Sequence, residues 1–255
     1  MQRLRPPALL ALALAAAPPA PAAPAAALPS APTKKADARV LVVTGIDYPG
    51  HKWRETTPVL VKALDADPRL GISVVEDFHY LASPDLATYD AVVLHYMPWE
   101  VPPPSAACQD GLKAFVASGK GLVLVHFACG AFPGWDEFVR IAGRAYDKRL
   151  RGHDPHGTFR VDIVKPDHPV VKGMEPFDTV DELYTCLGGD TPIEVLAAST
   201  SKVDKKEYPM AFVLSYGKGR VFHSPLGHDV KAFQEPVGAL FRRGTAWAAG
   251  LPPVP

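Results

Sequence analysis

The stretch GKGLVLVHFACGAFPGWDEF, residues 119–138, indicates the fold of this chain most directly. Its apolar run, Gly121–His126, is short and rich in Val and Leu, which is typical of a strand buried on both faces of a parallel sheet. A loop follows, and Trp135–Ala142 then has the apolar spacing of a helix. A strand that leads into a helix in this way is half of a βαβ unit, so the stretch predicts an α/β protein.

Three strands and two helices are expected on the N-terminal side of this stretch. Short apolar runs predict the strands, at residues 39–44, 72–76 and 91–96. Helical spacing predicts helices at 56–64 and 105–118, with Thr57 as N-cap and Pro58 as first residue of the former. Ser105 is the expected cap of the latter. Strands and helices that alternate at this spacing predict a doubly wound, mostly parallel sheet.

The chain beyond residue 143 has a different pattern. Thr158–Val164 alternates apolar and polar residues, as a half-exposed strand does. A tight glycine turn at 216–220 is expected to join two strands into a β-hairpin. Val237–Ala249 is expected to close the domain as a helix that stops at Gly250. The strands expected in this part, besides 158–164, are 193–198, 211–215 and 221–224.

Residues 1–27 have the three parts of a signal peptide. Arg3 and Arg5 supply a basic start, and Ala8–Ala17 is an apolar run too short to span a bilayer. Small residues follow, and they offer two cleavage sites between which the sequence does not choose, Ala20–Ala22 and Ala25–Ala27. The pattern predicts export to the periplasm or the extracellular space. The alternative is an N-terminus that is disordered and stays untranslocated.

Three segments make up the rest of the chain. Residues 28–37 are an Ala/Pro-rich linker, a composition expected to stay extended and not to pack. Residues 38–250 are expected to form a single α/β domain without internal repeats, and 251–255 a short tail. No segment after the signal peptide approaches transmembrane length, so no integral membrane segment is expected.

The charge balance argues against a nucleic-acid partner. The whole chain has 27 basic and 27 acidic residues. Without Arg3 and Arg5, 25 basic residues remain against the 27 acidic ones. A near-neutral protein lacks the basic surface that binds a phosphate backbone.

Several of the nine histidines lie where an α/β sheet builds its ligand sites. The carboxyl ends of parallel strands form the rim at which such sheets bind ligands. Imidazole is also the commonest metal ligand and the usual acid or base near neutral pH. The histidines that follow predicted strands or glycine-containing loops therefore predict one pocket, and they are His51, His126, His153, His156 and His228.

Asp181–Tyr184 (DELY) supplies the strongest acidic candidates for this pocket. A carboxylate beside imidazoles can ligate a metal, act as a base or orient a ring. Three histidines and one carboxylate suit Zn²⁺ or another borderline divalent ion, but a metal-free site with a His acid and a Glu base fits the same residues. Asp229 could orient a ring or bind a sugar hydroxyl. Apolar faces of the kind that sugar sites need are offered by Trp53, Trp99 and Trp135.

Five stretches, in order along the chain, resemble the ThuA-like (trehalose utilisation) family. They are VLVVTG…HKWRETTPVL (40–60), GKGLVLVHFACGAFPGWDEF (119–138), RGHDPHGTFRVDIVKPDHPVVKGM (151–174), DTVDELY (178–184) and YPMAFVLSYGKGRVFHSPLGHD (208–229). The resemblance implies a class I glutamine amidotransferase-like, flavodoxin-like fold. This is a three-layer sandwich with a mostly parallel sheet and a C-terminal β-hairpin plus helix. It also implies sugar substrates, namely trehalose and related disaccharides, including 3-keto sugars.

The resemblance also bears on particular residues. A histidine occupies the place of His126 in the family's pattern, and the D-E-x-Y segment favours Glu182 over Asp181. We therefore expect His126 and Glu182 to be catalytic. The expected ligands of a Zn-type ion are His51, His153 and His228. The expected substrate-binding residues are Trp53, Trp135, Tyr184 and Asp229.

Whether the chain is an enzyme stays open at this stage. The expected chemistry is proton abstraction next to a keto group of a sugar, then elimination or isomerisation, which leaves isomerase, lyase and hydrolase as classes. A small-molecule sugar is the expected partner, and a homo-oligomer is compatible with the sequence. The first alternative is a non-catalytic carbohydrate-binding or accessory protein on the same fold.

The second alternative is a glutamine amidotransferase with Cys129 as nucleophile. A nucleophilic cysteine needs a histidine oriented by a carboxylate, and the late His-x-Glu of such enzymes is missing. Cys129 also lies about three residues past the end of its strand, late for a nucleophile turn. With Cys108 and Cys186 it gives an odd, sparse count without CxxC spacing, which is no disulfide framework, although one bridge stays open.

Overall fold

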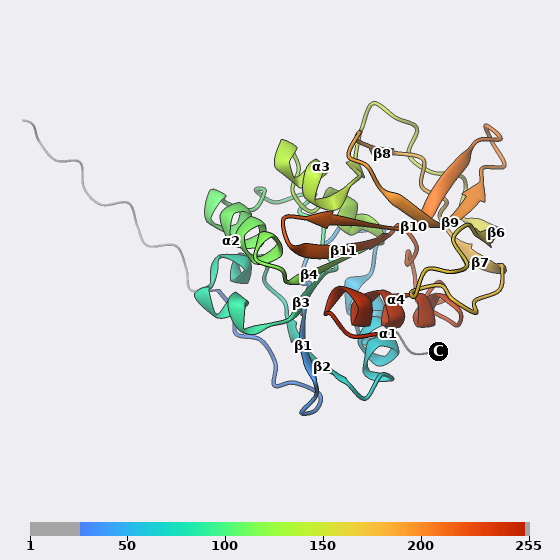
Figure 1. Cartoon of the computed structure of the whole chain (residues 1–255). Coiled ribbons are helices and arrows are strands. Elements are labelled where there is room, and N and C mark those ends of the chain that lie inside the picture. The colour runs from blue at the N-terminus through green and yellow to red at the C-terminus, as the bar shows by residue number, and fades with distance from the viewer. Residues whose placement is uncertain (1–25, 253–255) are drawn as a thin grey trace, which may run out of the picture.

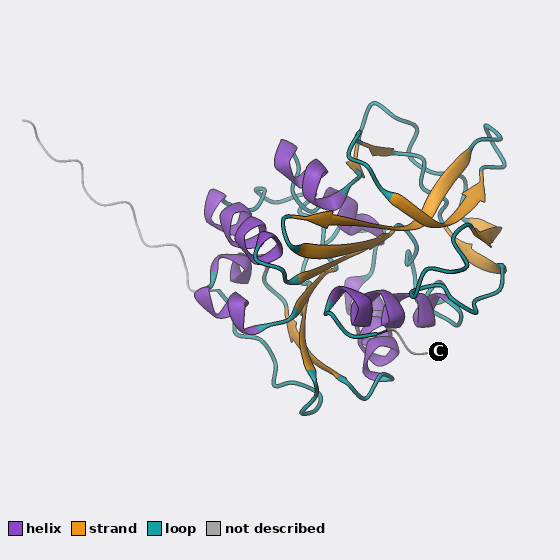
Figure 2. Ribbon diagram, in the orientation of Figure 1, coloured by secondary structure: helices purple, strands orange, loops and turns teal. Residues whose placement is uncertain are grey.

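A nine-stranded sheet with helices on both faces forms the centre of residues 26–252, the part of the chain that this computed structural model describes (Figures 1 and 2). Its strands are β1 (Ala38–Val43), β2 (Leu70–Val75), β3 (Ala91–Leu94), β4 (Gly121–Val125), β6 (Gly157–Ile163), β7 (Phe177–Asp181), β9 (Glu194–Thr200), β10 (Glu207–Tyr216) and β11 (Gly219–Ser224). A separate small sheet pairs β5 (Ala145–Tyr146) with β8 (Leu187–Gly188). The helices are α1 (Trp53–Asp65), α2 (Ala106–Ala117), α3 (Asp136–Ala142) and α4 (Val237–Ala248), with 3₁₀ turns η1 (Phe78–Ala82), η2 (Pro84–Thr88) and η3 (His126–Gly130).

The large sheet has a parallel half and an antiparallel half. Its order is β2-β1-β3-β4-β11-β10-β9-β6-β7, and the strands from β2 to β11 pair in parallel. This confirms the predicted flavodoxin-like, doubly wound arrangement, in which β11 occupies the fifth parallel position. The predicted hairpin is β10–β11, and from β10 onward the pairing is antiparallel. The sheet is therefore mixed, with its parallel strands at the core.

Neighbouring side chains on the central strands belong to different hydrophobic cores. On β1, Val40 and Val42 pack with side chains of α1 and α4, whereas Leu41 and Val43 pack with side chains of α2 and α3. All four are fully buried, which explains why this strand is an unbroken apolar run. Full burial of each such side chain stabilises the fold by about 1.5–3 kcal/mol. The predicted three-layer sandwich is confirmed (Figure 2).

The start of α1 differs from the prediction. The helix begins at Trp53, so Pro58 lies inside it and Thr57 is no cap. The Thr57 hydroxyl instead lies 3.0 Å from the Thr44 hydroxyl and 3.0 Å from His95 Nδ1 in a buried network. A threonine that finds polar partners in the core has no need to cap a helix, and sequence pattern cannot reveal such partners.

The other predicted helix ends agree with the structure. The Ser105 side chain accepts a hydrogen bond from the Cys108 backbone N–H at the start of α2. Gly250, just beyond α4, has φ +88°, the left-handed conformation that ends helices.

The Ala/Pro-rich linker packs along the edge of the sheet, contrary to the expectation that it stays unpacked. The backbone N–H groups of Ser30 and Thr33 donate to the carbonyls of Val74 and Ile72 on β2, at 2.8 and 2.9 Å. Their hydroxyl oxygens accept from the Val74 and Ile72 N–H groups, at 3.0 and 3.1 Å. β2 is an edge strand with unpaired backbone groups, and Ser and Thr supply the partners that composition alone did not suggest.

The expected chain termini lie largely outside the described residues. The predicted signal peptide, 1–27, falls there except for its last two residues, as does most of the tail, 251–255. The domain boundaries therefore stay predictions. Within residues 26–252, no helix combines the length and the apolar character that crossing a membrane requires.

Candidate metal centre

Four side chains that follow different strands meet at one edge of the sheet. His51 lies in the loop after β1, His126 directly after β4, Glu182 directly after β7, and His228 shortly after β11. Each offers one ligand atom, and these four atoms all lie within 4.8 Å of one another. β7 ends at this edge because an even number of antiparallel pairings separates it from β11, so both strands run the same way.

His126 occupies a sharp turn between β4 and η3. Its φ is +48°, a left-handed conformation that is uncommon for a non-glycine residue. The ring is fully buried, and Nδ1 donates to the Pro225 carbonyl at 2.6 Å. This leaves Nε2 facing the cluster, 3.0 Å from the Tyr184 hydroxyl. Burial holds the pKa of His126 well below its usual value, so the ring is neutral, the form that binds metals.

His51 is held by a buried carboxylate. Its Nδ1 lies 3.0 Å from Asp47 Oδ1, which directs Nε2 away from Asp47. Burial raises the pKa of Asp47 to about 6, and Asp47 Oδ2 is buried without a hydrogen-bond partner among the described residues. The His51 ring stacks on Phe127 and meets the rings of His126 and His228 at 5.0 Å each. A carboxylate behind a histidine is the usual outer support of a metal ligand.

Glu182 is the centre of the cluster. Its Oε2 lies 3.2 Å from His228 Nδ1 and 3.7 Å from His126 Nε2. Its Oε1 lies 3.6 Å from His153 Nε2. Burial raises the pKa of Glu182, but His228, His153 and His51 outweigh it and the net direction is downward, so the side chain is an anion.

His228 carries an unsatisfied atom. Burial lowers the pKa of His228, and the Glu182 carboxylate outweighs that effect, so the net direction is upward. Nevertheless Nδ1 is buried and makes no hydrogen bond within the described residues, although Glu182 is near. Its nearest polar partner is Glu182 Oε2 at 3.2 Å, so Nδ1 is paired by charge but lacks a hydrogen bond of normal geometry, and it can take a further partner.

Asp181 positions the two neighbouring ligands without facing the cluster itself. Its carboxylate accepts the backbone N–H groups of Gly227 at 2.7 Å, Glu182 at 2.8 Å and His228 at 3.1 Å. Burial raises the pKa of Asp181 to about 7. Sequence reasoning singled out the pair and preferred Glu182, but the role of Asp181 as a clamp between two loops has no sequence signal.

The geometry and chemistry of the four residues fit a divalent metal. Three imidazole nitrogens and one carboxylate oxygen are a Zn-type donor set. Ligand atoms in a tetrahedral Zn²⁺ site are about 3.4 Å apart, given metal–ligand bonds of about 2.0–2.2 Å. The separations of 3.2 and 3.7 Å around Glu182 lie close to that value. The cluster could therefore hold a metal, which would give His228 Nδ1 a direct partner besides the Glu182 carboxylate.

His153 and His156 lie beside this group but outside it. The His153 side chain is 42% exposed, and its Nδ1 donates to the Asp154 carbonyl at 2.7 Å. His156 Nε2 lies 3.4 Å from Asp229 Oδ2, and its ring meets that of His228 at 5.2 Å. Of the five histidines considered from the sequence, three belong to the cluster, His153 contacts Glu182, and His156 contacts the His228 ring and Asp229.

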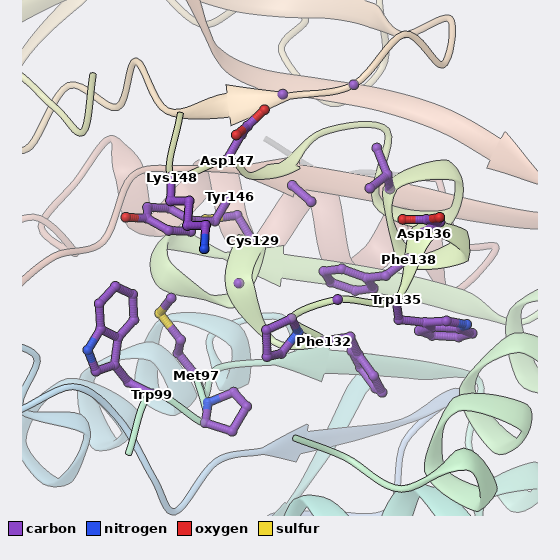
Figure 3. A pocket seen from close by; sticks show the side chains of 18 of the residues that line it. Met97, Trp99, Cys129, Phe132, Trp135, Asp136, Phe138, Tyr146, Asp147 and Lys148 are labelled. Carbon is purple, nitrogen blue, oxygen red and sulfur yellow. The ribbon is translucent and has the colours of Figure 1, made fainter. Parts of the chain in front are cut away.

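The expected substrate-binding residues are spread over different surroundings. Trp135 lines a cavity of about 670 Å³, as Trp99 does (Figure 3). Asp229 lines a smaller hollow of about 350 Å³ together with His228. Tyr184 is buried, with its hydroxyl on His126, which suits positioning of that ring. Trp53 is buried at the start of α1 and lines neither hollow, so the structure does not place it at the site.

The remaining histidines have structural surroundings. His95 and His223 are fully buried, and burial lowers their pKa values to about 3 and about 4. His79 is exposed beside Asp77. His168 Nδ1 accepts from the Val170 N–H in a turn.

Cys129 is unsuited to act as a nucleophile. It is buried, and burial raises the pKa of its thiol well above 9. The strained turn that would present a nucleophile is occupied by His126. Cys108, Cys129 and Cys186 are all free thiols, so the one disulfide left open by the sequence is not formed in this structure.

Fold and cluster together define a class: an α/β protein with a glutamine amidotransferase-like fold and a His/Glu group at the rim of its parallel strands. The structure resembles that of a GMP synthase protein from Thermoplasma acidophilum, with 12% identity, a TM-score of 0.50, and coverage of 85% of this chain and 96% of that one. At this identity the likeness concerns the fold alone.

The chain belongs to the ThuA family, whose model, described as trehalose utilisation, matches residues 39–248. A ThuA-like protein from Parabacteroides merdae is similar in structure, with 25% identity, a TM-score of 0.74, and coverage of 84% of this chain and 91% of that one. Another from Bacteroides uniformis has 18% identity, a TM-score of 0.68, and coverage of 85% and 93%. A comparison with curated proteins gave no significant match.

Proposed function

We propose that this protein is a metal-assisted enzyme that acts on sugars, either trehalose-type disaccharides or 3-keto-glycosides. The observation that carries the proposal is the convergence of three imidazoles and the Glu182 carboxylate within 4.8 Å. The Nδ1 atoms of His51 and His126 are already engaged by Asp47 and Pro225, so the cluster is preorganised. The family description supports sugars as the substrate class.

The proposed division of roles differs from the one expected from sequence. His126 and Glu182 join His51 and His228 as ligands, because their donor atoms are the ones that converge. His153 takes the role of general base. Its Nδ1 donates to a backbone carbonyl, so Nε2, which lies 3.6 Å from Glu182 Oε1, is the atom that would accept a proton, and the ring is accessible.

The proposed reaction is a β-elimination from a glycoside with a keto group at C3. His153 removes the proton on C2, next to the carbonyl, and the electron pair forms the C1–C2 double bond as the C1–O glycosidic bond breaks. The leaving alcohol takes up a proton, so the products are an enone and an alcohol, and no oxidant is consumed. A divalent ion held by the four residues would polarise the keto oxygen and stabilise the enolate.

Metal analysis and turnover test this proposal together. Protein purified without chelator is expected to contain one transition metal per chain and to convert 3-keto-trehalose or phenyl 3-keto-glucoside. Chelation is expected to abolish conversion, and Zn²⁺, Mn²⁺, Co²⁺ or Ni²⁺ to restore it. His79→Ala, an exposed histidine away from the cluster, serves as control and should change neither readout. No conversion with any of these ions would contradict the proposal.

We also propose that the protein is exported. The support is the basic start, apolar run and small residues of positions 1–27. N-terminal sequencing of the mature protein is expected to find cleavage at Ala20–Ala22 or Ala25–Ala27. An intact Met1 on protein recovered from cells would contradict export by this segment.

A further inference from the structure

The cavity of about 670 Å³ lies one side chain away from the candidate metal centre. Cys129 and Gly130 line it, and both belong to η3, the turn that begins with His126. Cys129 packs with Tyr184, whose hydroxyl lies 3.0 Å from His126 Nε2. The turn η3 therefore supplies both one residue of the ligand cluster, His126, and part of the cavity wall. A volume in this range is typical of small-molecule sites.

Exposed aromatic rings lead from the cluster to this cavity. Tyr48 lies 6.2 Å from the His51 ring and 5.4 Å from Trp99, which lies 5.7 Å from Tyr146, all measured between ring centroids. Tyr48, Trp99 and Tyr146 are 44%, 48% and 37% exposed. Single exposed apolar residues are ordinary, but three in contact indicate a binding surface.

The opposite wall of the cavity is also aromatic, and its rim is polar. Figure 3 shows Trp99 and Tyr146 on one side, with Trp135 and Asp136 on the other. Lys148, Arg149 and Asp147 complete the rim, and Arg149 Nη2 pairs with Asp147 Oδ2 at 2.6 Å. Charges of both signs around apolar rings suit an uncharged ligand that has hydroxyl groups and an apolar ring face. They do not suit a polyanion, which would need one sign of charge.

The second hollow next to the cluster has a different character. It is smaller, about 350 Å³, and polar groups of His228, Asp229, Lys52 and Glu55 line it. The cluster thus has a polar hollow at His228 and an aromatic cavity behind η3. A ligand with two unlike rings would use both.

We infer that the aromatic cavity is the subsite for the second ring of the substrate, the uncharged sugar or aryl group that leaves, while the reacting sugar lies at the His/Glu cluster. This inference rests on the proposed function. It names the substrate class as glycosides whose leaving group has a ring. Trp99 and Tyr146 would provide the faces on which that ring packs.

Equilibrium binding of three unoxidised glucosides tests the subsite. Trehalose, phenyl glucoside and methyl glucoside are titrated into the metal-loaded protein by calorimetry. Trp99→Ala and Tyr146→Ala are each expected to weaken binding of the first two about tenfold, the effect of one lost aromatic contact. Methyl glucoside, which lacks a second ring, should bind all variants alike. Trp99→Phe should retain most of the affinity.

The controls separate this inference from the function on which it rests. Val203→Ala changes an exposed apolar residue away from the cavity and should leave all three affinities unchanged. Melting temperatures report whether each variant is folded. If keto-glycosides are converted but Trp99→Ala and Tyr146→Ala weaken no ligand selectively, the subsite is wrong and the function stands. If no glucoside binds and no keto-glycoside is converted, both are overturned.

Discussion

Glu182 is the residue that links the imidazoles of the cluster, because its two oxygens lie 3.2 to 3.7 Å from nitrogens of His228, His126 and His153. Glu182→Gln keeps the shape of the side chain and removes its charge. We expect it to weaken metal binding at least tenfold and to reduce turnover at least as much. Plasma mass spectrometry of dialysed protein gives the metal content.

Asp229→Asn is the matched control for that prediction. It also replaces a carboxylate by an amide near His228, but Asp229 does not belong to the four-residue group. Its metal content should match that of the wild type. Equal metal loss in both variants would mean that general charge, not ligation by Glu182, holds the ion.

His153 is expected to act on the substrate without holding the metal. His153→Gln should lower kcat about 10²–10⁴-fold, the usual contribution of a general base. Its metal content should stay at one per chain, because the His153 ring lies outside the converging group. His126→Gln should instead lose metal. If His153→Gln retains the wild-type kcat, another residue acts as the general base.

Gly244 decides how closely helix α4 approaches the sheet. A Cβ at this position would lie 2.4 Å from Phe222 Cδ1 on β11. In an exposed helix, Gly→Ala stabilises by about 1 kcal/mol, but overpacking a core costs about 1–3 kcal/mol. We therefore expect Gly244→Ala to lower the free energy of unfolding, measured by urea denaturation.

A second glycine provides the comparison. A Cβ on Gly152 would meet nothing within 4 Å. Gly152→Ala should therefore leave stability nearly unchanged, within about 0.5 kcal/mol. Stabilisation by Gly244→Ala would show that the α4–β11 contact can relax.

At the scale of elements, the sequence predicted the buried strands well and the polar contacts between distant segments poorly. Strands such as β1 and β4 are buried on both faces, so nearly every residue in them has to be apolar. The start of α1 was missed because Thr57 bonds to Thr44 and His95, which are distant in sequence. The docking of Ser30 and Thr33 on β2 was missed for the same reason.

At the scale of the whole molecule, the burial of neutral histidines contributes a loss of stability as the pH falls below neutral. Burial lowers the pKa of His223 from 6.5 to about 4. As pH falls from about 6.5 to 4, the unfolded chain takes up a proton that the folded protein does not, so the free energy of unfolding falls. The difference between these two pKa values corresponds to a loss of about 3 kcal/mol in the free energy of unfolding.

Comparison with His223→Asn isolates this contribution. Asn can still donate to the Ala142 carbonyl, as His223 Nδ1 does, but does not titrate. The variant should lose less stability than the wild type between pH 7 and pH 5 in urea denaturation. The comparison between variant and wild type is needed because Asp47 and Asp181 have raised pKa values. These two groups make the free energy of unfolding rise as the pH falls, which opposes the effect of His223. If variant and wild type lose the same stability between pH 7 and pH 5, the titration of His223 does not contribute to the loss.

The sequence by itself determined the class of fold and most of the candidate ligands. Apolar runs and helical spacing reflect burial and periodicity, which act over a few neighbouring residues, and strand ends placed His51, His126 and His228 at one rim. Only the tertiary structure decided which side chains converge. Glu182 reaches the cluster because β7 runs the same way as β4, and Asp181 holds both loops through backbone groups of Gly227 and His228. Such contacts join residues far apart in the chain, so no local pattern records them.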